Sequence, residues 1–253
     1  MMATATKGVR AGFTTVTPYL MVADVDALVR FAKAAFGAVE TGRSHGGHGI
    51  HCELQIGDSM LMCGGPATKD RERPQALHLQ VPDVDATYQR ALAAGGESLA
   101  APEEKPYGER MAGVKDPVGN SWYIATHHGP LDEGIRAVTP YLHQADPLAL
   151  IEFLKQAFQA TEMGVYKTPD GRVMHAAVRI GDAVIEMGQT DPMLAGFYMY
   201  VPDAGALYQQ AIAAGAKSVL APADQPYGDH MGAVEDPWGN SWAIATHLGP
   251  RTA

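Results

Sequence analysis

Apolar side chains recur at helical spacing in two segments of the first half of the chain. The segments open with VADVDA at 22–27 and VPDVDA at 81–86, and they end at Gly37 and Gly95. Asp24 and Asp83 stand where helix N-caps are expected, and glycine is the usual residue after a helix. The residues on the two predicted apolar faces are Leu28, Phe31, Ala32 and Ala35 in the first helix, and Tyr88, Ala91 and Leu92 in the second.

Strand-like runs follow each predicted helix. The segment HCELQIGDSMLM at 51–62 indicates two strands joined at Gly57-Asp58, which is a hairpin signal. The segment Asp116–Asn120 predicts a turn that leads into the strand SWYIAT. The predicted order is strand, helix and then several antiparallel strands, twice in each half of the chain.

The two halves of the chain are copies of one another. DPVGNSWYIATHHGP at 116–130 is repeated as DPWGNSWAIATHLGP at 236–250 with twelve of fifteen positions unchanged, and VTPYL occurs at 16–20 and 138–142. We therefore predict a first domain at 1–130, a linker at 131–137 and a second domain at 138–253. Functional differences should appear where the copies differ.

Composition narrows the classes of function. The chain has 253 residues, of which 46% are hydrophobic, and a net charge of −9 without a basic run, which argues against a nucleic-acid partner. No stretch approaches the ~20 apolar residues of a membrane span, and the first residues lack the apolar segment of a secretory signal. Cys52 and Cys63 are expected to be reduced thiols on neighbouring strands, and we expect a cytoplasmic protein.

A β-α-β-β-β unit repeated in pairs resembles the vicinal oxygen chelate superfamily, which includes glyoxalase I, bleomycin-resistance proteins and extradiol dioxygenases. The resemblance rests on TPYLMVADVDALVRFAKAAFGA, on the IGDSMLM hairpin and on DPVGNSW, with their second copies. VMHAAVRIGDAVIEMG at 173–188 is most similar to the PhnB-like branch. The resemblance implies an α+β fold of tandem glyoxalase-like domains, each with two paired β-α-β-β-β modules that form a cupped mixed sheet, packed as an intramolecular pseudo-dimer. A homodimer is a further expectation.

The resemblance also implies four metal-ligand positions in each copy. They fall on Thr17, Met62, Ala76 and Tyr123 in the first copy and on Thr139, Glu186, Gly196 and Ala243 in the second. Only Glu186 is a strong ligand for a divalent metal. We therefore expect no metal site of the usual kind and no cofactor, and we leave a divalent metal at a non-standard site of the second domain as an alternative.

The ligand positions define which side chains face the cup, because side chains alternate along a strand. In the first copy this parity selects Tyr19, Met21, Met60, Met62, His78, Gln80 and Tyr123. In the second it selects Tyr141, His143, Val184, Glu186, Tyr198 and Tyr200. The first set is apolar, aromatic and rich in thioethers, which suits a small organic ligand.

His143 and Glu186 are the pair that could perform chemistry, as a general base with an orienting acid or as ligands of a displaced metal. A polar pair that makes hydrogen bonds in a cleft is the alternative. The repeated block PYGERM at 106–111 and PYGDHM at 226–231 adds candidates at the rim of the cup: Tyr107, Arg110, Tyr227 and His230. Arg110 could meet an anion and His230 could transfer a proton, and the other interpretation is a tight turn built on glycine.

The remaining histidines and tryptophans are given structural roles. We expect His51 and His175 to bond to a neighbouring strand, and His127, His128 and His247 to lie at the rim or surface. Trp122 and Trp242 fall off the cup-facing parity and are expected in the core.

Two functions remain in competition. The first is a protein of the bleomycin-resistance type that binds a small organic molecule in cup-shaped pockets without the usual metal. The second is a metal-assisted or acid/base lyase, isomerase or dioxygenase-like enzyme with its active site in the second domain, where His143, Glu186 and His230 would be catalytic.

Overall fold

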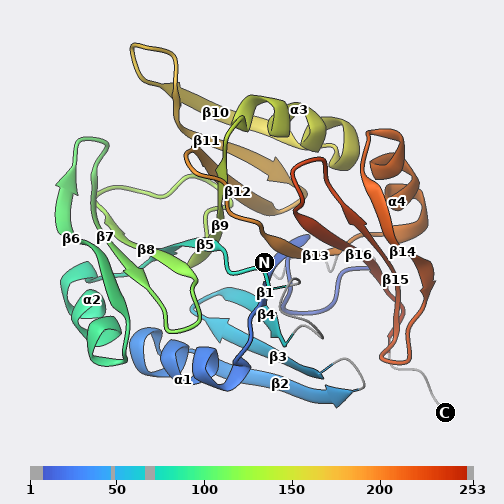
Figure 1. Ribbon diagram of the computed structural model, residues 1–253, viewed down its shortest axis with the longest axis horizontal. Helices are drawn as coiled ribbons and strands as arrows, with labels where there is room; N and C mark the ends of the chain where they lie inside the picture. The colour runs from blue at the N-terminus through green and yellow to red at the C-terminus, as the bar shows by residue number, and fades with distance from the viewer. Residues whose placement is uncertain (1–7, 47–48, 66–71, 250–253) are drawn as a thin grey trace. The chain divides into compact units, whose positions relative to one another are not determined.

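The computed structural model describes residues 8–46, 49–65 and 72–249 (Figure 1). The chain folds as two compact units, one at Tyr19–His143 and the other composed of the described parts of 1–18 and 144–253. The strands of the described residues form two mixed sheets of eight strands each. The predicted α+β class and the repeated order of elements in the two halves are confirmed.

The first half of the chain contains two β-α-β-β-β modules, as predicted. The first module is β1 (Val16–Met21), α1 (Val25–Phe36), β2 (Val39–Gly46), β3 (Gly49–Ile56) and β4 (Ser59–Gly64). The second is β5 (Ala76–Gln80), α2 (Val84–Ala93), β6 (Glu97–Lys105), β7 (Glu109–Lys115) and β8 (Ser121–His127).

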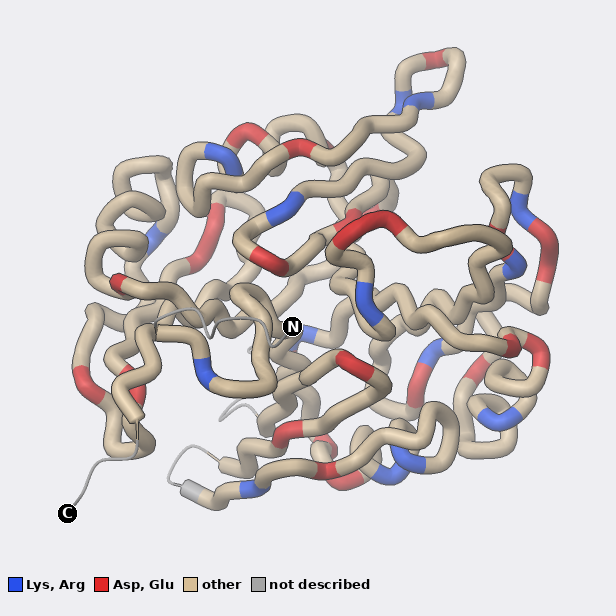
Figure 2. Tube along the Cα trace, turned by 180° about the vertical axis from the view of Figure 1, so that it is seen from behind, with Lys and Arg blue, Asp and Glu red and all other residues tan. Residues whose placement is uncertain are grey.

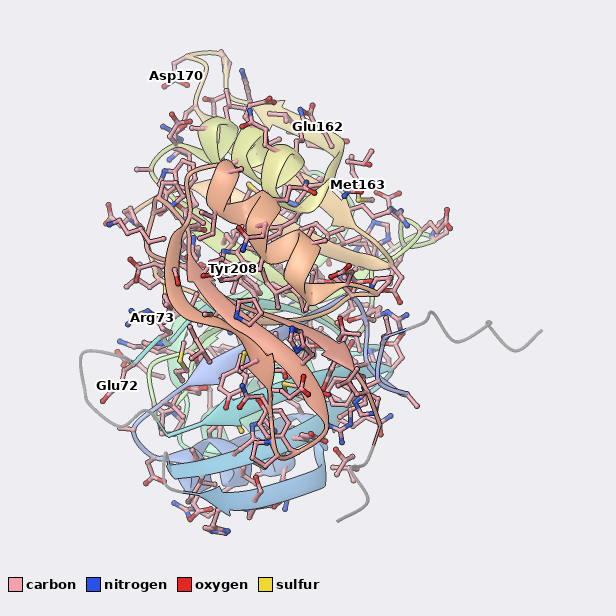
Figure 3. The ribbon with its side chains drawn as sticks, turned by 90° about the vertical axis from the view of Figure 1, so that its right-hand side faces the viewer. Glu72, Arg73, Glu162, Met163, Asp170 and Tyr208 are labelled. Carbon is pink, nitrogen blue, oxygen red and sulfur yellow. The ribbon has the colours of Figure 1, made fainter. Side chains whose placement is uncertain are left out.

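The second half repeats this order. Its first module is β9 (Val138–Gln144), α3 (Pro147–Phe158), β10 (Thr161–Lys167), β11 (Val173–Ile180) and β12 (Ala183–Gln189). Its second is β13 (Gly196–Tyr200), α4 (Ala204–Ala213), β14 (Lys217–Asp224), β15 (Asp229–Glu235) and β16 (Ser241–His247). Figure 3 labels Tyr208, which lies on α4. The Tyr208 hydroxyl donates a hydrogen bond to the Ser218 hydroxyl on β14 at 2.6 Å.

Strand pairing crosses the boundaries that the sequence repeat suggested. In the unit Tyr19–His143, the end of β1 pairs in parallel with β4, and β5 lies between β8 and β9. In the other unit, the first residues of β1 pair with β13, which lies in parallel beside β16. Strands β1 and β9 therefore each give residues to the unit formed mainly by the other half of the chain.

All four helices begin with the same cap. The aspartate before each helix accepts a hydrogen bond from the backbone N–H three residues later, as predicted for Asp24 and Asp83. Helix α1 ends at Gly37 with φ 69°, whereas α3 ends at Gln159 with φ 58°. Glycine adopts this left-handed conformation without strain, so the second copy has lost a favourable helix end.

One core fills the unit Tyr19–His143. Buried side chains of α1 and α2 pack with those of β1, β3, β4, β5, β7 and β8. Trp122 is 1% exposed and its ring lies 4.6 Å from that of Phe36. Trp242 is its fully buried counterpart in the other unit, 4.7 Å from Phe158. The core placement predicted for both tryptophans is confirmed.

The repeated DPxGN turn is built around a buried carboxylate. Asp116 Oδ1 accepts the N–H groups of Val118 and Asn120, and Oδ2 accepts Asn120 Nδ2 at 2.8 Å and Trp122 Nε1 at 3.0 Å. Asp236 repeats these four bonds in the other copy. These hydrogen bonds thus fix each turn at the start of the strand that follows it, β8 in the first copy and β16 in the second.

The surface charges are mixed in sign. Figure 2 shows acidic and basic positions interspersed along the chain rather than gathered in one basic segment. Across the described residues, the structure has no helix with both the length and the apolar character that a membrane crossing needs.

Candidate functional site

A polar face covers the sheet formed by β9, β5, β8 and β7, on the side away from the core. Strand register places His78 beside Tyr123 on β8 and beside Thr139 on β9. We call this surface the Tyr123 face, and its members are His78, Gln80, Glu109, Tyr123, Tyr141 and His143. All six belong to the unit Tyr19–His143.

Tyr123 and His143 form the centre of this face. The Tyr123 hydroxyl lies 2.8 Å from His143 Nε2, and the Tyr141 ring meets the Tyr123 ring edge-on at 5.3 Å. Burial raises the pKa of Tyr123 and lowers the pKa of His143. Both groups are therefore uncharged near neutral pH, and they form a neutral hydrogen-bonded pair.

A carboxylate stands at the other end of the Tyr123 face. Glu109 is 7% exposed, and its Oε1 accepts a hydrogen bond from Gln80 Nε2 at 2.9 Å. His78 Nε2 lies 3.7 Å from Glu109 Oε2 and 3.2 Å from Gln80 Nε2. This end of the face offers a carboxyl acceptor, and the Tyr123 end is neutral.

The other unit carries the equivalent arrangement on β13, β15 and β16, which we call the Asp229 face. Its members are Tyr198, Tyr200, Asp229 and His247. Asp229 is 3% exposed, with Oδ2 accepting from the Tyr198 hydroxyl and Oδ1 lying against His247 Nδ1, both at 2.7 Å. Burial is the main cause that raises the pKa of Tyr198 and of Tyr200, so both phenols remain protonated.

A histidine and a carboxylate also meet in the first module of each copy. His51 Nε2 lies 3.5 Å from Glu53 on β3, whereas His175 Nε2 lies 3.3 Å from Glu186 on β12. Register places Glu53 opposite Met62, and Glu186 opposite Ala177. The carboxylate has thus moved to the adjacent strand while remaining beside the equivalent histidine.

Apart from Glu186, the residues at the family ligand positions do not supply the His and carboxylate side chains of the usual metal site. Ala76, Gly196 and Ala243 have no donor atom, and Met62 offers a buried thioether. Thr17 is fully buried and its hydroxyl has no hydrogen-bond partner. In the ranges that the structure describes, no group of three or more His, Cys, Asp or Glu side chains is placed to hold a metal ion.

The structure divides the residues predicted for the first cup between two sheets. Tyr19 and Met21 lie on β1, where Tyr19 pairs with Met62 of β4, whereas His78, Gln80 and Tyr123 lie on β5 and β8. Met60 belongs to the first group, opposite Gln55. The reason is that β5 pairs with β9 and β8, and not with β1 or β4.

The residues predicted for the second cup are also divided. Tyr141 and His143 complete the Tyr123 face of the unit Tyr19–His143. Glu186, Val184, Tyr198 and Tyr200 belong to the other unit. The partner that the structure gives His143 is Tyr123, and a partner of Glu186 is His175.

Two of the predicted rim residues are exposed, and the other two are partly buried and pair with carboxylates. Tyr107 is 55% exposed and Tyr227 is 58% exposed. The Arg110 guanidinium contacts Asp85 through two nitrogens, at 2.7 and 2.8 Å. His230 Nδ1 lies 2.7 Å from Asp224.

The other predictions for single residues have mixed outcomes. Cys52 and Cys63 are free thiols opposite each other on β3 and β4, as expected. His51 bonds to the Tyr19 hydroxyl at 3.0 Å, in agreement with a structural role. His247 differs from a plain surface histidine, because it bonds to the buried Asp229.

Sequence reasoning missed three buried carboxylates: Glu53, Glu109 and Asp229. A signal was present for two of them, since PYGERM and PYGDHM both carry an acidic residue before the Arg110 and His230 positions. Glu53 has no acidic counterpart in the second copy, where Ala177 takes its place, so the comparison of copies could not reveal it.

Comparison with known proteins agrees with this architecture. The family model described as Glyoxalase/Bleomycin resistance protein/Dioxygenase superfamily matches residues 12–124 and 142–244. An uncharacterized protein of Mycobacterium bovis is 33% identical over 123 residues, which are 43% of this chain and 81% of that protein.

Solved structures share the fold. Glyoxalase I from Zea mays is similar with a TM-score of 0.72 at 15% identity, over 92% of each chain. A putative dioxygenase from Bacillus subtilis has a TM-score of 0.63 at 14% identity, over 97% of this chain and 87% of that one. With both copies matched by the family model, the chain belongs to the Glyoxalase/Bleomycin resistance protein/Dioxygenase superfamily.

Proposed function

We propose that this protein binds a small, uncharged organic molecule at the Tyr123 face, without the usual metal centre of the superfamily. The observation that carries the proposal is the hydrogen bond between Tyr123 and His143 at 2.8 Å. Tyr123 occupies the last of the four ligand positions, so an aromatic alcohol stands where metal-using relatives carry a metal ligand.

The neutral state of the pair favours an uncharged ligand. A phenol with a raised pKa and an imidazole with a lowered pKa offer hydrogen bonds but no full charge. In the part of the chain that the structure describes, His143 Nδ1 has no hydrogen-bond partner, so it can donate to or accept from a ligand. The edge-on rings of Tyr123 and Tyr141 supply apolar surface for the ligand body.

The test is a screen of uncharged aromatic alcohols and carbonyl compounds by ligand-observed NMR on the full chain. Compounds that bind should lose at least tenfold in affinity in Tyr123→Phe and in His143→Ala. Tyr88→Phe is the matched control, because it removes the same hydroxyl from a tyrosine of the same unit that lies in the core and not on the Tyr123 face. Hits that bind both Tyr123 and His143 variants as tightly as the wild type would refute the proposal.

A second candidate is a metal-assisted or acid/base enzyme whose active site in the second domain includes Glu186 and His175. The observation that favours it is the contact of His175 with the buried Glu186 at 3.3 Å. Metal analysis of purified protein separates the candidates. A stoichiometric transition metal that is lost in Glu186→Ala would overturn the binding proposal, and an activity unaffected by Glu186→Ala and His175→Ala would overturn the enzyme proposal.

Further features remain proposals. Membership of the PhnB-like branch is supported by the string at 173–188. A cytoplasmic location and a homodimer are expected on general grounds, and light scattering of the purified chain tests the homodimer.

A further inference from the structure

The Asp229 face contains a histidine oriented by a buried carboxylate. Asp229 is 3% exposed, and both of its oxygens are engaged, one by the Tyr198 hydroxyl and one by His247 Nδ1. An ionised carboxylate accepts hydrogen bonds and donates none, so Nδ1 of His247 carries the proton. The Nε2 atom then carries the lone pair and can accept a proton.

His247 is fixed in place but remains accessible. Its backbone N–H donates to the carbonyl of Gly8 at 2.9 Å, and the Tyr200 ring meets its imidazole edge-on at 6.2 Å. The side chain is 28% exposed, and Nε2 has no hydrogen-bond partner over the described ranges. A ligand can therefore reach Nε2 without moving the ring.

Further aromatic rings and a cation lie next to Tyr200, whose ring contacts this histidine. The Tyr198 and Tyr200 rings lie 5.0 Å apart, and Phe13 packs edge-on against Tyr200 at 5.6 Å. The Arg10 guanidinium lies 4.8 Å from the Phe13 ring centre. Arg10 also opposes the rise in the pKa of the Tyr200 phenol that burial and the neighbouring Asp229 produce. The surroundings are thus aromatic, with positive charge close to a tyrosine hydroxyl.

The first copy lacks this arrangement. His127 aligns with His247, but its Nδ1 lies 2.9 Å from the backbone carbonyl of Gly129. Glu109 aligns with Asp229, but its Oε1 accepts from Gln80. A carbonyl cannot balance the charge of an imidazolium as a carboxylate does, so at this position proton acceptance is favoured for His247 and not for His127.

We propose that His247 is the proton acceptor of a second ligand site, which takes a small aromatic molecule with an ionisable hydroxyl, that is, a phenol. In this step the O–H bond of the phenol breaks, its electron pair stays on oxygen, and the proton moves to Nε2. The products are a bound phenolate and an imidazolium, and the buried Asp229 balances the imidazolium charge. The site lies in the other unit from the Tyr123 face, so it stands independently of the function proposed above.

The test uses 4-nitrophenol, whose phenolate absorbs visible light and whose phenol does not. The full chain is titrated in a buffer more acidic than the pKa of the free compound. We expect a saturable phenolate band that falls at least tenfold in His247→Gln and in Asp229→Asn. His127→Gln, the matched control, should keep it. No saturable band, an equal band in His247→Gln, or an equal loss in His127→Gln would overturn the proposal.

A second measurement avoids the risk that the variants fail to fold. Wild-type protein with ¹⁵N-labelled histidine is followed by NMR while 4-nitrophenol is added. The Nε2 resonance of His247 should move to the imidazolium position, and that of His127 should not. A His247 resonance that stays at the neutral position in the presence of bound compound would overturn the proposal.

Discussion

Replacing Asp116 with asparagine should destabilise the unit Tyr19–His143 by a predictable amount. The carboxylate accepts four hydrogen bonds, and Oδ2 receives two of them, from Asn120 Nδ2 and Trp122 Nε1. An amide keeps one oxygen for the two backbone N–H groups but directs its own NH₂ group at the other two donors. Each of these two buried donors costs about 1–3 kcal/mol when left unpaired, so the loss should be about 2–6 kcal/mol.

The assay is urea unfolding that is monitored by hydrogen exchange with mass spectrometry, which reports on each unit separately. In Asp116→Asn, peptides covering 116–127 should exchange faster and lose protection at lower urea. Asp236→Asn should do the same at 236–247, because its four bonds are equivalent. Asp132→Asn is the exposed control and should change stability by less than about 0.5 kcal/mol. A loss below about 1 kcal/mol in Asp116→Asn would refute the reasoning.

Three further predictions concern single groups. Burial lowers the pKa of His143 below 6.5, so the unfolded chain takes up the proton first as the pH falls, and the stability of the folded chain decreases. In His143→Gln the urea midpoint should therefore depend less on pH between pH 7 and 5. An unchanged dependence of the midpoint on pH contradicts this. Gln159→Gly should raise the free energy of unfolding by about 1 kcal/mol, because glycine adopts a φ of 58° without strain. Gly37→Ala should lower it by about as much, since its added Cβ meets no atom within 4 Å and only the backbone conformation is strained. Thermal unfolding measures both, and changes of the opposite sign count against the argument. Arg43 is the main cause that lowers the pKa of Glu40 from 4.5 to about 2, so the stabilisation by ionised Glu40 is complete above pH 4.5 and disappears as the pH falls to about 2. In Glu40→Gln the stability should therefore decrease less steeply between pH 4.5 and 2. An equally steep decrease argues against the pairing.

Much of the fold could be predicted from the sequence because its signals act over a few residues. The caps at Asp24 and Asp83, the hairpin at Gly57 and the DPxGN turn depend on neighbours close in the chain, and the structure contains each of them. The parity argument also succeeded for Trp122, since alternation along a strand needs no knowledge of its partners.

The candidate site was predictable only in part. Parity selected Tyr123 and His143 as residues of a functional face, but placed them in different cups. They meet because β9 pairs with β5, a contact between strands far apart in the chain. Glu109 was not predicted, because an acidic residue in a polar loop block is expected at the solvated surface. Its burial depends on the pairing of β7 with β8.

By itself the sequence determined a duplicated β-α-β-β-β framework, with its caps, turns and core tryptophans. Only the tertiary structure decided which carboxylates are buried and which side chains they face: Glu109 meets Gln80, and Asp229 meets Tyr198 and His247. The physical reason is that local conformation depends on adjacent residues, whereas the chemistry of a side chain depends on burial and on partners that strand pairing brings together from distant parts of the chain.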